Sequence, residues 1–348
     1  MKKNVKKKKA SRASATSEAT QFSSRSVGIW AGASPTSKKS LREGLTRLKK
    51  MGVKAVAEKS TLSAATQQES KDRPYLAGSD RQKVDSLIKL LKDSKVNDIF
   101  CVRGGYGSTR LIPALDQLAL PKEASRIWGF SDMTTLQNYL FLRAGYPWVH
   151  SPMLTSSSFI DPKPREKNQW EAPSSSDQTL TYKVKRLEGS SIDRLREIPS
   201  EAVIIGGNLA CLSSLVACNT VVFPQNDFFV FLEELSERPH RVDRMLTLLT
   251  QSGFFDHCRA VFLGYFTECP GWQGVIKAWS QETKIPVYTG LPAGHDRPNC
   301  ALPMGVTVKI SPPNKVSKNM AKNLAKKSKS DNNLSSMELL FPNLAFGC

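Results

Sequence analysis

Three segments of the sequence place glycine or a reactive side chain at the end of an apolar, strand-like run. They are Arg103-Gly104-Gly105-Tyr106-Gly107, Gly129-Phe130-Ser131-Asp132 and Gly294-His295. Open α/β sheets form their ligand sites in the loops that follow their strands. A serine hydroxyl, a histidine base and glycine N–H groups are also the groups that nucleophilic catalysis uses. We therefore take these three segments as the candidates for chemistry.

Ser131 lies where a predicted strand ends and a predicted helix begins. This placement exposes the hydroxyl near the positive end of the helix dipole, as in a nucleophile elbow. The local sequence, GFSD, does not follow the pattern G-x-S-x-G. Serine is also a preferred helix N-cap residue, so the alternative interpretation is that Ser131 only caps the helix.

The Arg103–Gly107 segment follows one predicted strand and precedes a predicted helix. Glycines in such a turn let backbone N–H groups approach an anion or a developing oxyanion. The alternative is a tight turn between strand and helix that binds nothing.

A histidine base must be one of four residues, His150, His240, His257 or His295. His240 and His257 lie on or beside a charged helical segment and are expected at the surface. His150 and His295 both lie in loops at strand ends, so spacing alone does not choose between them. For either residue the alternative is a structural histidine that only makes hydrogen bonds.

The elements that must position these residues alternate between strand and helix from residue 26 onward. This βαβ order predicts a three-layer α/β domain with a largely parallel sheet over residues 26–154. Strands are predicted at 27–35, 53–58, 98–103 and 126–130, and helices at 40–52, 81–93, 108–118 and 132–145.

A stretch rich in Ser, Pro and charge at 155–200 predicts a linker or crossover, and a second domain follows at 201–348. The second domain contains strand-like runs and one amphipathic helix at 241–253. The run MELLFPNLAF is expected to pair with VTVKIS, which would leave a Lys-rich insert at 314–335 on the tip of that hairpin.

The net charge of +19 is concentrated in two segments of the 348-residue chain. Residues 2–12 hold seven Lys or Arg and residues 315–329 hold six Lys, in both cases without an acidic residue. We expect residues 1–25 to be a disordered, solvated tail and the insert to be a disordered hairpin tip. The alternative for the insert is a basic amphipathic helix that contacts an anionic polymer.

Seven cysteines, an odd count without a C-x-x-C pair, argue against a disulfide framework and a zinc site. No apolar run approaches the roughly 20 residues of a membrane span. The basic start is not followed by the apolar segment of a signal peptide, so we predict a cytoplasmic protein.

Taken in order, the motifs closely resemble the LD-carboxypeptidase family over about residues 27–310. This family includes muramoyltetrapeptide carboxypeptidases and microcin-immunity peptidases. Several motifs in the family's order are far more specific than any one of them. The motifs are YLAGSD, DIFCVRGGYGSTRLIPALD, GFSDMTTLQ, HSPML, IIGGNLACLSSL, FLEELSERPHRVDRML, VFLGYFTEC, GLPAGH and N-x-x-LPMG.

The resemblance implies a Ser-Glu-His triad. The nucleophile of the family's G-[FY]-S-D motif falls on Ser131, the glutamate of L-E-[DE] on Glu233 rather than Glu234, and the histidine of G-x-P-x-G-H on His295. In the general scheme for such triads, His295 takes the serine proton and returns it to the leaving amine, while Glu233 orients the imidazole.

The resemblance also implies the remaining parts of the site. The oxyanion hole would use the backbone N–H groups of Asp132 and of Gly104 or Gly105. Arg103 is a candidate for binding a substrate carboxylate, with a structural salt bridge as the alternative. The family fold is a Rossmann-like N-terminal domain with a smaller, β-rich C-terminal domain, the site lies at their interface, and homodimers are common. No metal or organic cofactor is implied.

The implied function is hydrolysis of the bond between meso-diaminopimelate and the terminal D-alanine of murein tetrapeptides in cell-wall recycling. The enzyme alternative is a microcin-immunity type amide hydrolase of peptide or aminoacyl nucleotides, which an aromatic platform from Trp170, Trp272 or Trp279 would favour. A non-catalytic basic binding protein is the third hypothesis, and retention of all three triad residues argues against it. The chain departs from the family at His240, where tyrosine is usual.

Overall fold

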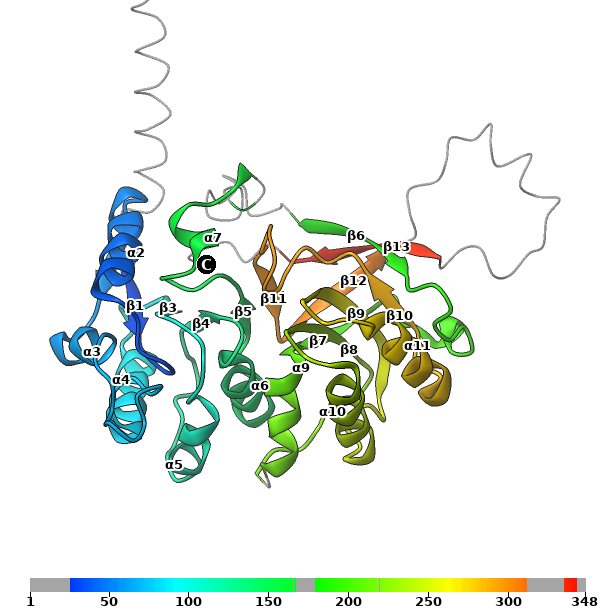
Figure 1. Cartoon of the computed structure of the whole chain (residues 1–348), viewed down its shortest axis with the longest axis horizontal. Coiled ribbons are helices and arrows are strands. Elements are labelled where there is room, and N and C mark those ends of the chain that lie inside the picture. The colour runs from blue at the N-terminus through cyan, green and yellow to red at the C-terminus, as the bar shows by residue number, and fades with distance from the viewer. Residues whose placement is uncertain (1–25, 165, 167–178, 219, 312–334, 343–348) are drawn as a thin grey trace, which may run out of the picture. The chain divides into compact units, whose positions relative to one another are not determined.

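The computed structural model groups the chain into two compact units (Figure 1). The first unit contains the described residues of 26–129 and 152–166, and the second contains those of 130–151 and 179–342. The predicted tail at 1–25 and nearly all of the predicted insert at 314–335 lie outside the described residues. The structure describes residues 26–164, 166, 179–218, 220–311 and 335–342.

The first unit has the predicted α/β architecture, with four parallel strands in the order β2-β1-β3-β4. β3 is buried along its whole length, as expected for a parallel strand covered on both faces. The strands are β1 (Ser26–Trp30), β2 (Lys54–Val56), β3 (Asp98–Cys101) and β4 (Arg126–Gly129). The helices are α2 (Lys38–Lys50), α3 (Lys59–Ala64), α4 (Asp80–Lys92), α5 (Ile112–Asp116) and α7 (Ser157–Ile160), with a 3₁₀ turn at Thr109–Leu111.

Local signals explain where α4 begins and which face it buries. Ser79 and Gln82 form a reciprocal capping box that satisfies N–H groups of the first turn. Val84, Leu87 and Leu91 lie at helical spacing and are buried. The predicted helix at 81–93 is therefore confirmed.

The second unit is built on a closed barrel with the strand order β10-β6-β13-β12-β7-β8-β9. The barrel encloses aromatic side chains of β8 and β9, including Phe229, Phe231 and Phe262, all fully buried. The helices α10 (Pro239–Gln251) and α11 (Trp272–Thr283) lie side by side next to it (Figure 1). The barrel strands are β6 (Leu180–Arg186), β7 (Glu201–Asn208), β8 (Phe228–Leu235), β9 (Cys258–Thr267), β10 (Val287–Thr289), β12 (Val306–Ser311) and β13 (Ser336–Phe341).

Further elements of the second unit precede or interrupt the barrel strands. The short strands β5 and β11 pair antiparallel, with Leu302 opposite His150. These elements are α6 (Met133–Ala144), β5 (Trp148–His150), α9 (Leu209–Ser213), β11 (Leu302–Met304) and the 3₁₀ turns Leu195–Glu197 and Ser214–Ala217.

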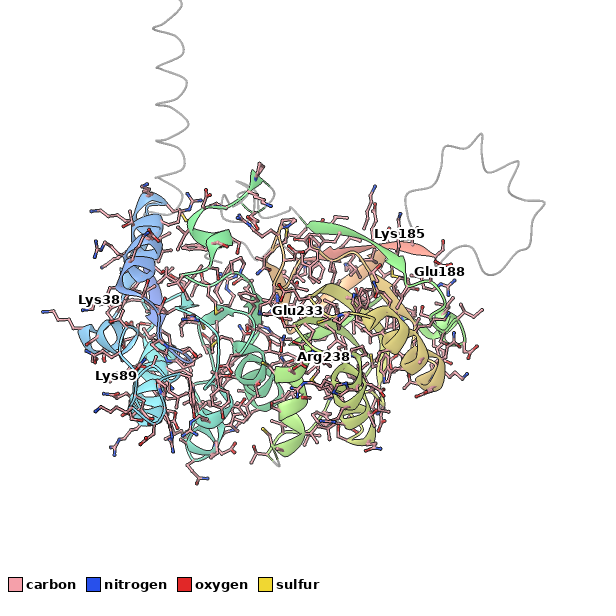
Figure 2. The ribbon with its side chains drawn as sticks, viewed as in Figure 1. Lys38, Lys89, Lys185, Glu188, Glu233 and Arg238 are labelled. Atoms are coloured by element: carbon pink, nitrogen blue, oxygen red, sulfur yellow. The ribbon has the colours of Figure 1, made fainter. Side chains whose placement is uncertain are left out.

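Two predictions about the C-terminal region have different outcomes. The pairing of MELLFPNLAF with VTVKIS is confirmed, because β12 and β13 are antiparallel with Lys309 opposite Leu340. The predicted linker at 155–200 is wrong for residues 180–186, which form β6 between β10 and β13. The error has a physical cause. Val184 is buried while Lys183 and Lys185 are exposed, so a half-exposed strand resembled a charged loop. Lys185 is labelled on this strand in Figure 2.

The two compact units are defined by contacts and do not coincide with the predicted domains, whose boundary stays a prediction. A first domain ending at residue 154 was predicted, whereas residues 130–151, with α6 and β5, are grouped with the barrel. Chain order suggested the first domain because α6 directly follows β4. Tertiary contacts of α6, described below, account for the observed grouping.

Candidate active site

Ser131 occupies a strained turn directly between β4 and α6. Its φ is +60°, a left-handed conformation that costs a non-glycine residue about 1–3 kcal/mol. The turn is closed by backbone hydrogen bonds from Met133 N to Phe130 O (3.3 Å) and from Thr134 N to Ser131 O (2.9 Å). The N-cap position of α6 is taken by Asp132, so Ser131 is not the helix cap that the alternative interpretation proposed.

The structure brings Ser131, His295 and Glu233 into one hydrogen-bonded row within the second unit. The Nε2 atom of His295 lies 3.1 Å from Ser131 Oγ, and its Nδ1 atom lies 2.7 Å from Glu233 Oε2. The His295 side chain is 14% exposed and that of Glu233 is fully buried. An imidazole between a hydroxyl and a buried carboxylate can remove the hydroxyl proton and hold the resulting positive charge.

A glycine beside His295 permits this close approach. Gly294 has a φ of +124°, and a Cβ at this position would lie 2.9 Å from Glu233 Oε2. Its N–H donates to Asn299 Oδ1 at 3.2 Å, which ties the loop between β10 and β11 together. Any larger residue at 294 would push the imidazole away from the carboxylate.

Two adjacent glutamates on β8 point to different partners. Glu233 meets His295, whereas Glu234 accepts hydrogen bonds from Asn208 Nδ2 (2.8 Å) and from the backbone N–H groups of Ala210 (2.7 Å) and Leu235 (2.8 Å). Burial raises the pKa of Glu234 to about 7. The resemblance predicted Glu233 rather than Glu234 as the partner of the histidine, and Glu233 is the residue in contact with it.

Burial and charge act in opposite directions on His295. Burial alone lowers the pKa of the imidazole, but the hydrogen bond and charge of Glu233, with the charge of Glu234, outweigh burial and raise it above its ordinary value. The ring also packs against Phe130, with centroids 4.8 Å apart.

His150, the other candidate base, is 1% exposed and contacts neither Ser131 nor a carboxylate by a hydrogen bond. Burial lowers the pKa of His150 to about 4, so the ring is neutral at physiological pH. Spacing did not distinguish His150 from His295, and the contacts do. The structure also places His240 on the exposed side of α10, as expected.

A polar clasp that the sequence analysis missed joins α6 to residues 206–211. The Asn138 amide accepts from Gly206 N at 3.0 Å and donates to Gly206 O at 2.9 Å. Asn208 N donates to Thr134 Oγ1 (3.1 Å), and Thr135 Oγ1 donates to the Cys211 carbonyl (2.7 Å). We name Thr134, Thr135 and Asn138 the α6 clasp. The available signal was three polar residues at helical spacing on a helix that is buried on nearly all sides.

The glycine turn is tied to Ser34 of the first unit. Gly104 O accepts from Ser34 N (3.2 Å), and Tyr106 N donates to Ser34 Oγ (3.1 Å). Gly105 has a φ of +104°, and a Cβ there would lie 2.3 Å from Ser34 Oγ. The exposed Arg103 donates to the Pro35 carbonyl at 2.7 Å and forms no ion pair with a carboxylate in the described part of the chain. The oxyanion and substrate roles of these residues stay predictions.

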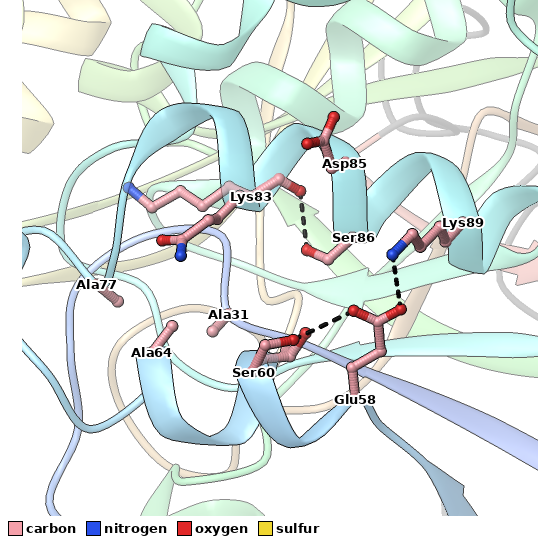
Figure 3. Close-up of a pocket in the computed structure, with 11 residues that line it drawn as sticks. Ala31, Glu58, Ser60, Ala64, Ala77, Lys83, Asp85, Ser86 and Lys89 are labelled. Carbon is pink, nitrogen blue, oxygen red and sulfur yellow. Dashed lines mark hydrogen bonds and ion pairs between the residues drawn. The ribbon is translucent and has the colours of Figure 1, made fainter.

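A cavity of about 190 Å³ in the first unit lies between α3 and α4 (Figure 3). Three of its polar side chains pair with one another, since Glu58 binds Lys89 Nζ (2.9 Å) and Ser60 Oγ (3.2 Å). Ala31, Ala64 and Ala77 supply apolar walls, and none of the three triad candidates lines it. Over the described ranges, no group of three or more His, Cys, Asp and Glu residues is arranged to hold a metal ion.

Comparison with known families identifies two matching segments. Residues 27–151 match the family model of the LD-carboxypeptidase N-terminal domain, and residues 201–310 match that of the LD-carboxypeptidase C-terminal domain. Ser131 lies in the first segment, and Glu233 and His295 lie in the second. The two segments together cover more than half of the chain.

Similar proteins include two that are named for murein peptides. A murein tetrapeptide carboxypeptidase of Pseudomonas aeruginosa is 30% identical over 248 residues, covering 67% of this chain and 78% of the relative. A probable murein peptide carboxypeptidase of Bacillus subtilis is 26% identical over 288 residues, covering 80% of this chain and 86% of the relative.

Solved structures show the same fold. A muramoyltetrapeptide carboxypeptidase from Oxalobacter formigenes superposes with a TM-score of 0.69 at 23% identity, over 91% of this chain and 99% of the other. The microcin C7 self-immunity protein MccF, in complex with glutamyl sulfamoyl guanosine, superposes with a TM-score of 0.66 at 20% identity. The match covers 82% of this chain and 92% of the other. The predicted fold class, a parallel-sheet N-terminal domain with a β-rich C-terminal domain, is confirmed.

Proposed function

Because the chain belongs to the LD-carboxypeptidase family, we propose that it removes the terminal D-alanine from murein tetrapeptides through a triad of Ser131, His295 and Glu233. Membership confirms the resemblance and, with it, the prediction of a serine-type carboxypeptidase, a hydrolase. The identity of the bond and the roles of the three residues are our proposal. The relatives' names support the peptide, and the geometry supports the residues.

The observation that carries the proposal is the continuous row of hydrogen bonds from serine to glutamate. Serine has almost no nucleophilic anion at neutral pH, so its attack requires a base within hydrogen-bond distance. The 3.1 Å separation of His295 Nε2 from Ser131 Oγ meets that requirement. The 2.7 Å bond from Nδ1 to buried Glu233 holds the imidazole in the tautomer that accepts at Nε2.

The reaction then follows in two steps. Ser131 Oγ attacks the carbonyl carbon of meso-diaminopimelate while His295 takes the serine proton. His295 returns that proton to the amine of D-alanine, the C–N bond breaks, and an acyl-enzyme remains. A water molecule, deprotonated by His295, hydrolyses the ester and restores the serine. Glu233 stabilises the imidazolium in both steps.

The negative oxygen of each tetrahedral intermediate needs N–H donors. The N–H of Asp132 follows the nucleophile at the start of α6, where the helix dipole favours negative charge. We assign the second donor to Gly104 or Gly105 and the binding of the substrate carboxylate to Arg103. The guanidinium of Arg103 is exposed and has no carboxylate partner among the described residues, which leaves its planar fork available for a carboxylate.

The second candidate function is hydrolysis of a peptide or aminoacyl nucleotide, which the likeness to MccF supports. The sequence analysis named three tryptophans as a possible platform for a base. Trp279 is 4% exposed and packs against Phe255, so it cannot stack on a ligand without unfolding its surroundings. Trp272 stacks on Phe266 at 4.9 Å and is partly exposed. Trp170 lies outside the described residues.

The remaining predictions concern location and assembly. Within the described residues, no helix has both the length and the hydrophobicity to cross a membrane. We keep as predictions the cytoplasmic location, the homodimer and the contact of the basic segments with an anionic polymer.

Incubation of the purified chain with L-Ala-D-Glu-meso-diaminopimelate-D-Ala, followed by mass spectrometry of released D-alanine, tests the proposal. A Ser131→Ala variant is the control. Release by the wild type alone supports both the reaction and the nucleophile. Release by both proteins would refute Ser131, and release by neither would favour a nucleotide conjugate as substrate.

A further inference from the structure

The imidazole of His150 packs against residues next to the triad and makes no side-chain hydrogen bond to a described residue. It belongs to β5, and its ring packs edge-on against Phe130 (5.7 Å between centroids) and Phe231 (4.9 Å). Phe130 precedes Ser131 in the chain and also contacts His295, and Phe231 is two residues before Glu233 on β8. His150 thus contacts one ring that adjoins Ser131 and packs on His295, and a second ring on the strand that carries Glu233.

Both ring nitrogens of His150 are buried and lack a hydrogen-bond partner in the part of the chain that the structure describes. A buried polar side chain without a partner is costly, by about 1–3 kcal/mol in proteins, and is therefore rare. Phenylalanine or leucine would fill the same space between two aromatic rings without this cost. The imidazole therefore needs an explanation other than packing.

Glu233 presents a matching unpartnered atom. Its Oε2 binds His295, while Oε1 is buried and accepts no hydrogen bond from any described residue. Burial is the larger effect on the pKa of His150 and lowers it, while the charge of Glu233 acts on the same ring in the opposite direction. An unpaired acceptor and an unpaired imidazole therefore lie within electrostatic range of each other.

We propose that His150 is a positioning residue whose ring N–H donates, through one ordered water, to Oε1 of Glu233. No direct hydrogen bond joins the two groups, and buried polar groups that lack protein partners are commonly bridged by water. The bridge fixes the second carboxylate oxygen, so that Oε2 stays in line with His295. This inference rests on the proposed function of the triad and extends it to a residue outside the triad.

The ring suits this role because it stays neutral. Burial holds the pKa of His150 at about 4, so it donates a hydrogen bond without adding a second positive charge beside the imidazolium of His295. The charged and titratable groups that act on His150 are Glu233 and His295, and its ring also contacts the apolar rings of Phe130 and Phe231. Lysine or arginine at this position would instead compete with His295 for the carboxylate.

The test compares His150→Leu, which keeps the apolar contacts and removes both nitrogens, with His150→Gln, which keeps a donor and an acceptor. For the leucine variant we expect kcat to fall about tenfold at an unchanged KM, since one hydrogen bond to a charged group is worth that much. The acid limb of kcat/KM should move to higher pH, because the charge of Glu233 then acts on His295 alone. The glutamine variant should recover most of kcat and the original pH profile.

Trp148→Phe is the matched control on the same strand. It removes another buried nitrogen that has no partner among the described residues, but the ring packs against Phe141 rather than against Phe130 or Phe231. Its kcat and pH profile should equal those of the wild type. Equal losses in the leucine and glutamine variants, or an unmoved pH profile in the leucine variant, would refute a hydrogen-bonding role for His150.

A second measurement separates this inference from the proposed substrate. The rate at which a fluorophosphonate labels Ser131 reports on the nucleophile without any peptide. If the wild type releases no D-alanine, the proposed substrate fails, and slower labelling of His150→Leu than of His150→Gln still supports the positioning role. Equal labelling rates of these two variants and the wild type would overturn it.

Discussion

The turns that follow β3 and β4 both contain left-handed backbone positions, but different residue types occupy them. After β3, the left-handed positions are occupied by Gly105 (φ +104°) and Gly107 (φ +139°), which adopt them without strain. After β4, the left-handed position is occupied by Ser131 at φ +60°. Of these two turns, only the one that presents a reactive side chain retains strain, which is the pattern expected of a functional turn.

The two turns also differ in their anchors. The glycine turn is tied to Ser34 of its own unit, while the helix that follows Ser131 is tied by the α6 clasp to residues 206–211 of the barrel unit. The nucleophile is thereby held on the same body as Glu233 and His295. Four predictions test this contrast.

The largest effect should come from the serine turn itself. Ser131→Ala removes the nucleophile and should lower kcat by about 10⁴-fold or more. Ser131→Gly should be as inactive as Ser131→Ala. It should be more stable than Ser131→Ala by about 0.5–1 kcal/mol, because glycine adopts the left-handed conformation without strain. Kinetics and urea unfolding measure the two effects. A glycine variant less stable than the alanine variant would show that the turn is not strained.

Breaking the clasp should have the next largest effect. Asn138→Leu leaves the N–H and C=O of Gly206 unpaired and should cost about 2–4 kcal/mol of stability. We also expect a loss of about tenfold in kcat, because the start of α6 is no longer held in register with His295. Leu249→Ala, a buried change in α10, is the control, since it should destabilise by about 2–5 kcal/mol without lowering kcat. Equal kcat losses in both variants would mean that the clasp only stabilises the fold.

A side chain added to the glycine turn should have a smaller effect. It should lower the stability, whereas Ser131→Gly should raise it. Gly105→Ala adds left-handed strain and a clash with Ser34, so it should cost about 2–3 kcal/mol in thermal unfolding. Gly145→Ala is matched to it, because Gly145 has a φ of +72° and a Cβ there would meet no described neighbour within 4 Å. That control should cost only about 1 kcal/mol. Equal costs would show that Ser34 moves aside.

The smallest effect should come from Glu234, the second of the two adjacent glutamates on β8. Since Glu233 and Glu234 raise the pKa of His295, the base should be lost as the pH falls through a value above the ordinary 6.5. Glu234→Gln removes one of these charges and should move the acid limb of kcat/KM to lower pH by a few tenths of a unit, with little change in kcat. A pH–rate profile measures both. An acid limb at or below 6.5 in the wild type would contradict the raised pKa.

Much of the fold could be predicted because its signals are local. The capping box at Ser79, the buried stripe of α4 and the short apolar strands each depend on residues close together in the chain. β6 could not be predicted in this way, since its seven residues contain only one fully buried side chain, Val184. Its strand conformation depends on partners at β10 and β13, far along the chain.

For the site, the sequence by itself determined the order of the motifs, and through them the family and the three residues proposed for the triad. The tertiary structure showed that His295 contacts Ser131, and it alone decided that Ser131 is strained rather than a helix cap and that α6 is clasped to the barrel unit. The reason is physical. Residue type and spacing specify which groups are available, whereas hydrogen bonds between positions 131, 233 and 295 exist only once long stretches of chain have folded together.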